Sequence, residues 1–252
     1  MEYKFTIKGN QFHSVGDYNE AIKCYSEAIK ADPNDSEAYM FKGDALYHLK
    51  QYSKAIEYCD KALEMDSNNA QAYRLKGDIM YRVEQYKDAM LCYDAALQID
   101  PDDTNMYVFK GDAIYNLGRY EEAIECYDRA LEMDSNNIQA RIFKGDSMNN
   151  LERYDEAIKC FDEALSMDSN NAEAYYLKGI SMDRLGRYAE AIECCDAALK
   201  IDPDHVEARY VKDIATKSLP KSEDCQHRRL IVCKEKPIAG SHYCGKHIKN
   251  HY

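Results

Sequence analysis

A period of 34 residues runs through most of this sequence and constrains its fold more than any other feature. The segment FKGDALYHLKQYSKAIEYCDKALEMDSNN, which begins at Phe41, recurs with few changes at Phe109 and at Phe143. Self-similarity at a fixed step of roughly 20–50 residues is the signature of a repeat protein. Six units are therefore predicted: 2–35, 36–69, 70–103, 104–137, 138–171 and 172–205.

Within each unit the apolar residues recur with helical spacing. In the second unit, Ala38, Phe41 and Ala45 mark one expected helix, while Ala55 and Ala62 belong to another. Polar breaks supply stop and restart signals for these helices: Asp32-Pro33, Asp66-Ser67, Asp100-Pro101 and Asp202-Pro203. Each unit is therefore predicted to be a helical hairpin.

One glycine recurs in the middle of every first helix, where glycine costs about 1 kcal/mol relative to alanine. The six positions are Gly9, Gly43, Gly77, Gly111, Gly145 and Gly179. A cost that is repeated six times indicates a packing requirement. We expect this glycine, together with Ala55 and Ala62 and their equivalents on the second helix, to let the two backbones of a hairpin approach closely.

The order of residues within a unit resembles that of the tetratricopeptide repeat. In the fourth unit the matching residues are Tyr107, Gly111, Ile114, Tyr120, Ala123, Tyr127 and Ala130, with Ser135 where proline is usual. The resemblance covers roughly residues 2–218 and implies an all-α fold, a right-handed α-solenoid of six helical hairpins. One departure recurs: a lysine precedes every glycine where the family commonly has leucine.

A further first helix is expected after the sixth unit, but no second helix follows it. Residues 206–218 continue the pattern, with Asp213 where the glycine would stand, and Pro220 ends it. Repeat arrays need a polar cap on each open end. The repeat array is therefore predicted to cover residues 2–218, with 206–218 as a capping helix.

The resemblance also implies a concave groove that is lined by the first helices and binds peptides or partner helices. The positions concerned form an aspartate row, a tyrosine row and a mixed third row: Asp44, Asp78, Asp112 and Asp146; Tyr47, Tyr81 and Tyr115; Met40, Arg74, Val108, Ile142 and Tyr176. Carboxylates beside aromatic rings suit a segment with Lys or Arg side chains and apolar anchors. The alternative is that the aspartates are ordinary solvated surface and the rings are core.

Catalytic patterns are absent from the repeats. The sequence contains no glycine-rich phosphate loop, no nucleophile elbow and no HExxH pair. Three histidines, His13, His48 and His205, stand apart in the sequence and are predicted to be surface or cap positions. The prediction is a non-enzymatic scaffold or adaptor for protein–protein interaction.

Seven of the ten cysteines follow the repeat period. They share two adjacent positions of the second helix with tyrosine and phenylalanine: Cys24, Cys92, Cys126, Cys160 and Cys194 at one, Cys59 and Cys195 at the other. Cysteine that alternates with tyrosine in a packed helix acts as hydrophobic fill. These seven thiols are predicted to lie in the core.

The last three cysteines do not follow the period. Cys225, Cys233 and Cys244 are spaced C-x7-C-x10-C-x2-H, which ends at His247. We predict that these four residues bind one structural Zn²⁺ within residues 219–252, and the ending GSHYCGKH resembles the Cys3His zinc knuckles of some nuclear proteins. Two alternatives stay open: another histidine as the fourth ligand, or a disordered basic tail with incidental thiols.

Charge is distributed unevenly along the chain. Residues 221–252 hold seven Lys/Arg and three Asp/Glu, a net charge of +4. Since the whole chain has a net charge of −12, the first 220 residues carry −16. The basic residues Arg228, Arg229, Lys234 and Lys236 are candidates for contact with an acidic partner. The main alternative function is a nucleic-acid or chromatin-associated factor whose knuckle contacts DNA or RNA while the repeats recruit partners.

The first residues, MEYKFTIKGNQ, lack the continuous apolar core of a signal peptide. No window approaches the roughly eighteen apolar residues that span a bilayer. The expectation is a chain of the cytoplasm or nucleus that is not secreted and does not enter a membrane.

Overall fold

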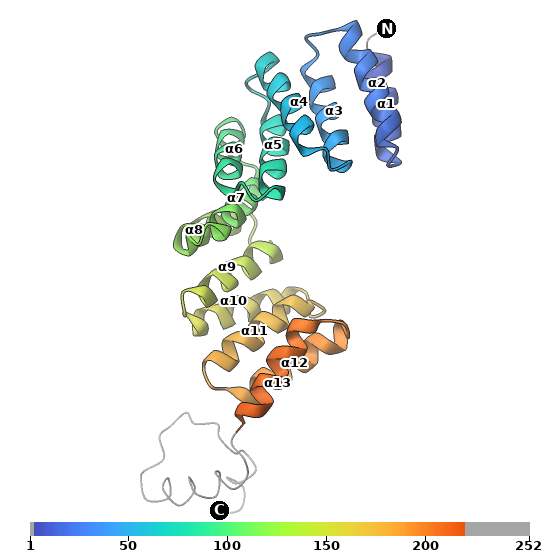
Figure 1. Ribbon diagram of the computed structural model, residues 1–252. Helices are drawn as coiled ribbons and strands as arrows, with labels where there is room; N and C mark the ends of the chain where they lie inside the picture. Colours follow the sequence, from blue (N-terminus) through green and yellow to red (C-terminus); the bar gives the residue numbers. More distant parts are fainter. Residues whose placement is uncertain (1–2, 220–252) are drawn as a thin grey trace, which may run out of the picture.

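The computed structural model describes residues 3–219, and this part of the chain consists of thirteen α-helices without a β-strand (Figure 1). Twelve helices form six consecutive hairpins: α1 (Tyr3–Ser14) with α2 (Tyr18–Ala31), α3 (Ser36–His48) with α4 (Tyr52–Met65), α5 (Ala70–Arg82) with α6 (Tyr86–Ile99), α7 (Thr104–Asn116) with α8 (Tyr120–Met133), α9 (Ile138–Asn150) with α10 (Tyr154–Met167), and α11 (Ala172–Arg184) with α12 (Tyr188–Ile201). A single helix, α13 (Val206–Ser218), follows them. The prediction of an all-helical solenoid is confirmed.

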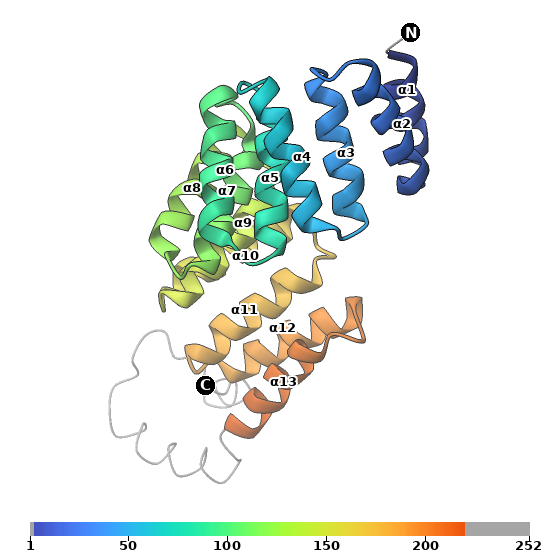
Figure 2. The ribbon, with the colours of Figure 1, turned by 45° about the horizontal axis from the view of Figure 1, so that its top comes forward.

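The hairpins stack in two layers. Each helix packs against its hairpin partner, and each even-numbered helix packs against the first helix of the next hairpin. Most neighbouring odd-numbered helices also contact one another, whereas no two even-numbered helices within residues 3–219 contact to the same extent. The odd-numbered helices therefore form the inner layer of a curved stack that leads from α1 to α13 (Figures 1 and 2).

The polar breaks end and restart the helices as predicted. Asp32 caps the end of α2, where its backbone N–H donates to Ala28 O and its carboxylate accepts from Asn34 N at 2.9 Å. An aspartate ends every even-numbered helix in the same way. The next helix then starts at a capping side chain, as at Asn137, whose Oδ1 accepts from Ala140 N at 2.9 Å.

Four of the six mid-helix glycines accommodate an aromatic ring, whereas Gly43 and Gly179 lie close to a cysteine and a backbone carbonyl, so the predicted approach of two backbones holds only in part. A methyl group on Gly111 would lie 2.6 Å from Cε1 of Tyr127, a ring that projects from the second helix of the same hairpin and is fully buried. Gly9, Gly77 and Gly145 face Tyr25, Tyr93 and Phe161 in the same manner. At Gly43 the facing residue is the smaller Cys59, and the nearest atoms are 3.3 Å away.

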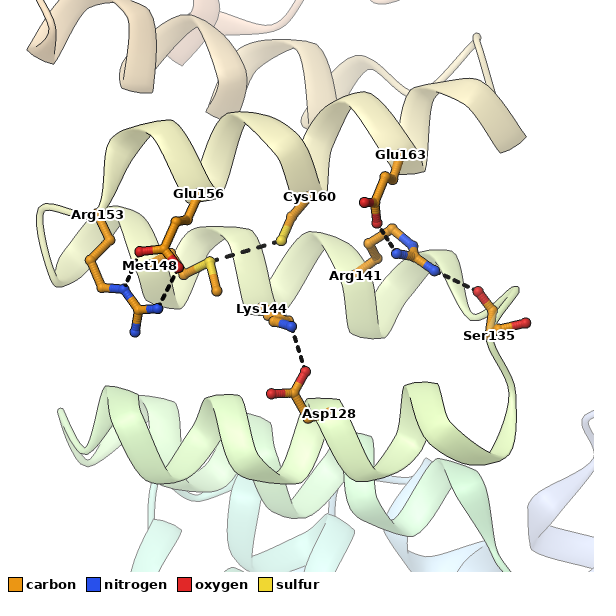
Figure 3. A network of polar contacts seen from close by, with 9 residues as sticks. All are labelled: Asp128, Ser135, Arg141, Lys144, Met148, Arg153, Glu156, Cys160 and Glu163. Atoms are coloured by element: carbon orange, nitrogen blue, oxygen red, sulfur yellow. Dashed lines mark hydrogen bonds and ion pairs between the residues drawn. The ribbon is translucent and has the colours of Figure 1, made fainter.

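The lysine that replaces the family's leucine joins neighbouring hairpins. Lys144 Nζ on α9 lies 2.5 Å from Asp128 Oδ1 on α8 (Figure 3). Four equivalent pairs have distances of 2.6 Å: Lys76–Asp60, Lys110–Asp94, Lys178–Asp162 and Lys212–Asp196. We call these five pairs the lysine seam. Between α2 and α3 the seam is interrupted, because Ser26 stands where the aspartate would be and Lys42 lies over the ring of Tyr58 instead.

The seven cysteines of residues 3–219 are free thiols, and all but the partly exposed Cys92 are buried. Burial raises the pKa of Cys59 and of Cys195 to about 12. Their placement confirms that they act as hydrophobic fill. None of the helices in this part of the chain has the length and apolarity needed to cross a membrane.

Candidate functional site

The predicted aspartate and tyrosine rows lie on the inner layer. Asp44 and Tyr47 belong to α3, and their equivalents follow on α5, α7 and α9. All seven residues of these two rows are partly exposed. At the corresponding place on α11 the sequence has Ile180, so the aspartate row ends at α9.

The tyrosine of one hairpin is hydrogen-bonded to the aspartate of the next. Tyr115 Oη on α7 donates to Oδ2 of Asp146 on α9 at 2.7 Å, and it accepts from Nδ2 of Asn150 at 3.0 Å. The same three partners occur one hairpin earlier: Tyr81, Asp112 and Asn116. We call these six residues the Tyr–Asp strip. It runs without a break along α5, α7 and α9.

The two asparagines of the strip were missed in the sequence analysis, although the period marks them. Asn116 and Asn150 are 34 residues apart; Asn116 follows Tyr115, and Asn150 follows Asn149, which stands where the tyrosine row would continue. Arg82 occupies the same place on α5 and hydrogen-bonds Tyr47. Each tyrosine of the row therefore has a polar partner 35 residues further along the chain.

Asp78 is held differently from the other aspartates. Arg74 Nη1 lies 2.9 Å from Oδ2 of Asp78, one turn away on the same helix. Tyr93 Oη on α6 donates to Oδ1 of Asp78 at 2.9 Å. Arg74, predicted as a groove residue, thus partly neutralises the aspartate row at α5.

Burial raises the pKa of Asp78, Asp112 and Asp146 above the ordinary aspartate value. Arg74 opposes this effect at Asp78, and the tyrosine hydrogen bonds oppose it at all three carboxyls. Desolvation raises these pKa values more than the hydrogen bonds and Arg74 lower them. A positive charge placed beside the carboxylates would therefore stabilise their ionised form. A ligand ammonium or guanidinium group can supply that charge.

The third predicted row is divided between surface and core. Met40, Arg74 and Tyr176 are partly exposed. In contrast to the prediction, Val108 and Ile142 are only 5% and 2% exposed and pack in the hydrophobic core. They do not line a surface.

Two of the predicted surface histidines meet beside Asp44, which the sequence analysis did not foresee. His13 Nε2 lies 3.1 Å from Asp44 Oδ2, and His48 Nε2 lies 3.7 Å from Asp44 Oδ1. His205 acts as a cap, as predicted, and its Nδ1 accepts from Ala208 N at the start of α13.

The predicted zinc ligands Cys225, Cys233, Cys244 and His247 lie outside the described residues. The same holds for the basic residues Arg228, Arg229, Lys234 and Lys236.

Comparison with protein-family models supports the repeat assignment. The tetratricopeptide repeat model matches residues 12–70 and 149–206, and the model of anaphase-promoting complex, cyclosome, subunit 3 matches residues 82–164. No curated protein sequence matches the chain. The tetratricopeptide repeat is thus supported by sequence for residues 12–70 and 149–206.

Solved structures share this fold. The crystal structure of YrrB, described as a TPR protein with an unusual peptide-binding site, is 28% identical, has a TM-score of 0.64, and covers 75% of this chain and 97% of its own. MamA is 25% identical with a TM-score of 0.61, covering 66% and 96%. The APC/C hetero-tetramer Cut9-Hcn1 has a TM-score of 0.67 at 17% identity and covers 85% of this chain but 42% of that chain, so it shows the fold alone.

Proposed function

We propose that this chain is a non-enzymatic scaffold of the cytoplasm or nucleus that binds an extended peptide or protein segment along its inner layer. The Tyr–Asp strip is the observation that carries this proposal. It places Asp112 and Asp146 on successive hairpins, in partly exposed positions that tyrosine hydrogen bonds hold in place. Side chains that are already held in one geometry lose less entropy when a ligand binds.

The charge of the strip indicates the chemistry of the ligand. Burial raises the pKa of Asp112 and of Asp146, which means that it disfavours their charged form. A Lys or Arg side chain of the ligand that reaches either carboxylate would form a charge-assisted hydrogen bond with it. The rings of Tyr81 and Tyr115 offer apolar and cation–π contacts beside the carboxylates. YrrB, whose described feature is a peptide-binding site, is consistent with a peptide ligand for this fold.

Peptide display on the untagged full-length chain tests the proposal. We expect selected peptides to contain Lys or Arg interspersed with apolar residues. The double variant Asp112→Asn/Asp146→Asn should bind them at least about tenfold more weakly, since a hydrogen bond to a charged group is worth about 1.5–3 kcal/mol. Fluorescence anisotropy with a labelled selected peptide measures this change.

Glu125→Gln is the matched control, because it removes one exposed carboxylate from α8 in the outer layer. Binding should be unchanged in this variant. Equal affinities for the wild-type chain and the double variant would contradict the strip as the binding surface, even if peptides were selected.

We also propose that Cys225, Cys233, Cys244 and His247 bind one structural Zn²⁺, on the support of their spacing alone. Elemental analysis of freshly purified protein should find zinc, and Cys233→Ser should lower its content. Less than about half an equivalent of zinc, with no change in the variant, would refute this part of the proposal. A nucleic-acid role would rest on this segment, because the first 220 residues carry a net charge of −16.

A further inference from the structure

Three potential metal ligands meet between the first two hairpins. His13 comes from the last turn of α1, and Asp44 and His48 lie one turn apart on α3. One ligand atom from each of the three side chains can be chosen so that all lie within 4.8 Å of one another. The two histidines are 35 residues apart in sequence and become neighbours only because α1 packs on α3.

The rings in this cluster are held by aromatic packing. The imidazole of His48 stacks on Tyr18, with ring centroids 4.6 Å apart and planes inclined by 5°. His13 stands edge-on to both rings, at 5.1 Å from Tyr18 and 5.4 Å from His48. The imidazoles are therefore oriented before any ligand arrives, which reduces the entropy lost on binding.

One nitrogen of the cluster lacks a hydrogen bond. His13 Nε2 is buried and has no hydrogen-bond partner in the described part of the chain, although Asp44 Oδ2 is only 3.1 Å away. A buried imidazole nitrogen that faces a carboxylate without hydrogen bonding to it has a lone pair or proton left unsatisfied.

We propose that His13, Asp44 and His48 bind one divalent transition-metal ion of the zinc type. Two imidazole nitrogens and one carboxylate oxygen are a donor set of open zinc sites. Tetrahedral bonds of about 2.0–2.1 Å place neighbouring ligand atoms about 3.3 Å apart. His13 Nε2 lies 3.1 Å from one carboxylate oxygen of Asp44 and His48 Nε2 lies 3.7 Å from the other, so both nitrogens are close to that separation from the carboxylate. Ca²⁺ and Mg²⁺ fit poorly because they prefer oxygen ligands throughout.

The place of the cluster in the fold supports a clamping role. It joins the first hairpin to the second, which is where the lysine seam is interrupted at Ser26 and Lys42. Within residues 3–219, the first hairpin packs against a single neighbouring hairpin. A metal ion at this point supplies a link between hairpins that the other five junctions obtain from an ion pair.

Cobalt titration tests this site apart from the predicted tail site. The protein is the untagged full-length chain with Cys225, Cys233 and Cys244 replaced by serine, and the probe is Co²⁺. We expect one equivalent to bind with visible d–d absorption and without a thiolate charge-transfer band in the near ultraviolet. His13→Ala and His48→Ala should each weaken binding at least about tenfold, since even loss of an outer-shell partner costs about 10–100-fold.

His205→Ala is the matched control. His205 also lies beside two carboxylates, Glu173 at 3.4 Å and Glu207 at 3.2 Å, but outside the cluster. Its removal should leave cobalt binding unchanged. Asp44→Asn, which keeps the shape of the side chain, should weaken binding while circular dichroism shows an unchanged helix content.

Three results would overturn the proposal. The first is an absence of d–d absorption in the serine-substituted chain. The second is cobalt affinity that is unaltered in correctly folded His13→Ala and His48→Ala variants, or is reduced as much by His205→Ala. The third is a thiolate charge-transfer band, which would assign the metal to the cysteines of the repeats.

Discussion

At the scale of single residues, each mid-helix glycine is explained by the side chain that faces it. Gly111 faces the ring of Tyr127, which is fully buried and would lie 2.6 Å from an added methyl group. Gly43 faces Cys59 Sγ and Ala55 O at 3.3 Å, a contact that a small shift relieves. The same sequence position therefore tolerates a methyl group to different degrees in different hairpins.

Gly111→Ala should lower the free energy of unfolding by up to about 2 kcal/mol. Alanine favours the helix by about 1 kcal/mol, but overpacking a buried site costs typically about 1–3 kcal/mol. Gly43→Ala is the control and should be close to neutral. Urea denaturation followed by circular dichroism measures both. An equal loss in the two variants would mean that the facing ring is not the cause.

Asp146→Asn should raise the free energy of unfolding at neutral pH. Burial raises the pKa of Asp146 in the folded state above 3.8, so the folded state binds the proton more tightly than the unfolded state does. Stability from this group is therefore present at low pH and is lost as the pH rises through the folded-state pKa. Asparagine carries no charge, so the Asp146→Asn protein does not lose this stability as the pH rises. Its side-chain oxygen can still accept the hydrogen bond from Tyr115 Oη.

The gain from Asp146→Asn should disappear as the pH falls below 3.8. Urea denaturation at a series of pH values measures it, with the exposed Glu125→Gln as the control. A destabilised Asp146→Asn protein at neutral pH would show that the bond from Tyr115 outweighs desolvation.

At the scale of elements, the lysine seam joins each even-numbered helix to the next odd-numbered one from α4 onward. The lysine side chains are 19–36% exposed and the aspartates 36–53% exposed. Such pairs are partly screened by water, so each contributes little on its own. Their regular placement orients consecutive hairpins relative to one another.

A double-mutant cycle on Lys144→Ala and Asp128→Ala should give a coupling energy of about 0.2–1 kcal/mol. The coupling should shrink at about 1 M salt, where the Debye length is about 3 Å. Unfolding in urea at low and high salt measures it. The control cycle uses Lys42→Ala and Ser26→Ala, which form no ion pair and should show no coupling. Coupling of similar size in both cycles would exclude the ion pair as its origin.

At the scale of the whole molecule, α13 covers the end of the stack. Ala215 on α13 is fully buried against Ile158, Met182 and Ala191 of the last two hairpins. Without α13 these apolar residues would lose their cover on one side. The terminal unit of a solenoid needs such a cap.

A chain of residues 1–205 should therefore have a Tm several degrees below that of the full chain, since a loss of 1 kcal/mol lowers Tm by about 2–4 °C in proteins of this size. A chain of residues 1–219 keeps α13 and should match the full chain. Thermal unfolding by circular dichroism compares the three. Equal Tm values for 1–205 and 1–219 would contradict the capping role of α13.

Much of this architecture could be predicted because its causes are local. Helix ends depend on residues such as Asp32 and Asn137, which hydrogen-bond within three or four positions of themselves. The cysteines could be placed because Cys59 and Cys195 share a repeat position with tyrosine. Periodicity makes such local rules visible, since each is repeated six times over.

The sequence by itself determined the number of hairpins, their boundaries and the burial of the cysteines, since these follow from spacing within one repeat. Only the tertiary structure showed that Tyr115 reaches Asp146, that Val108 is core, and that His13 joins Asp44. Those contacts link residues 31 positions apart or depend on which side of a helix faces its neighbour. Which of these residues meet depends on how far one hairpin is rotated relative to the next. That rotation is set by the packing of the whole interface between the two hairpins.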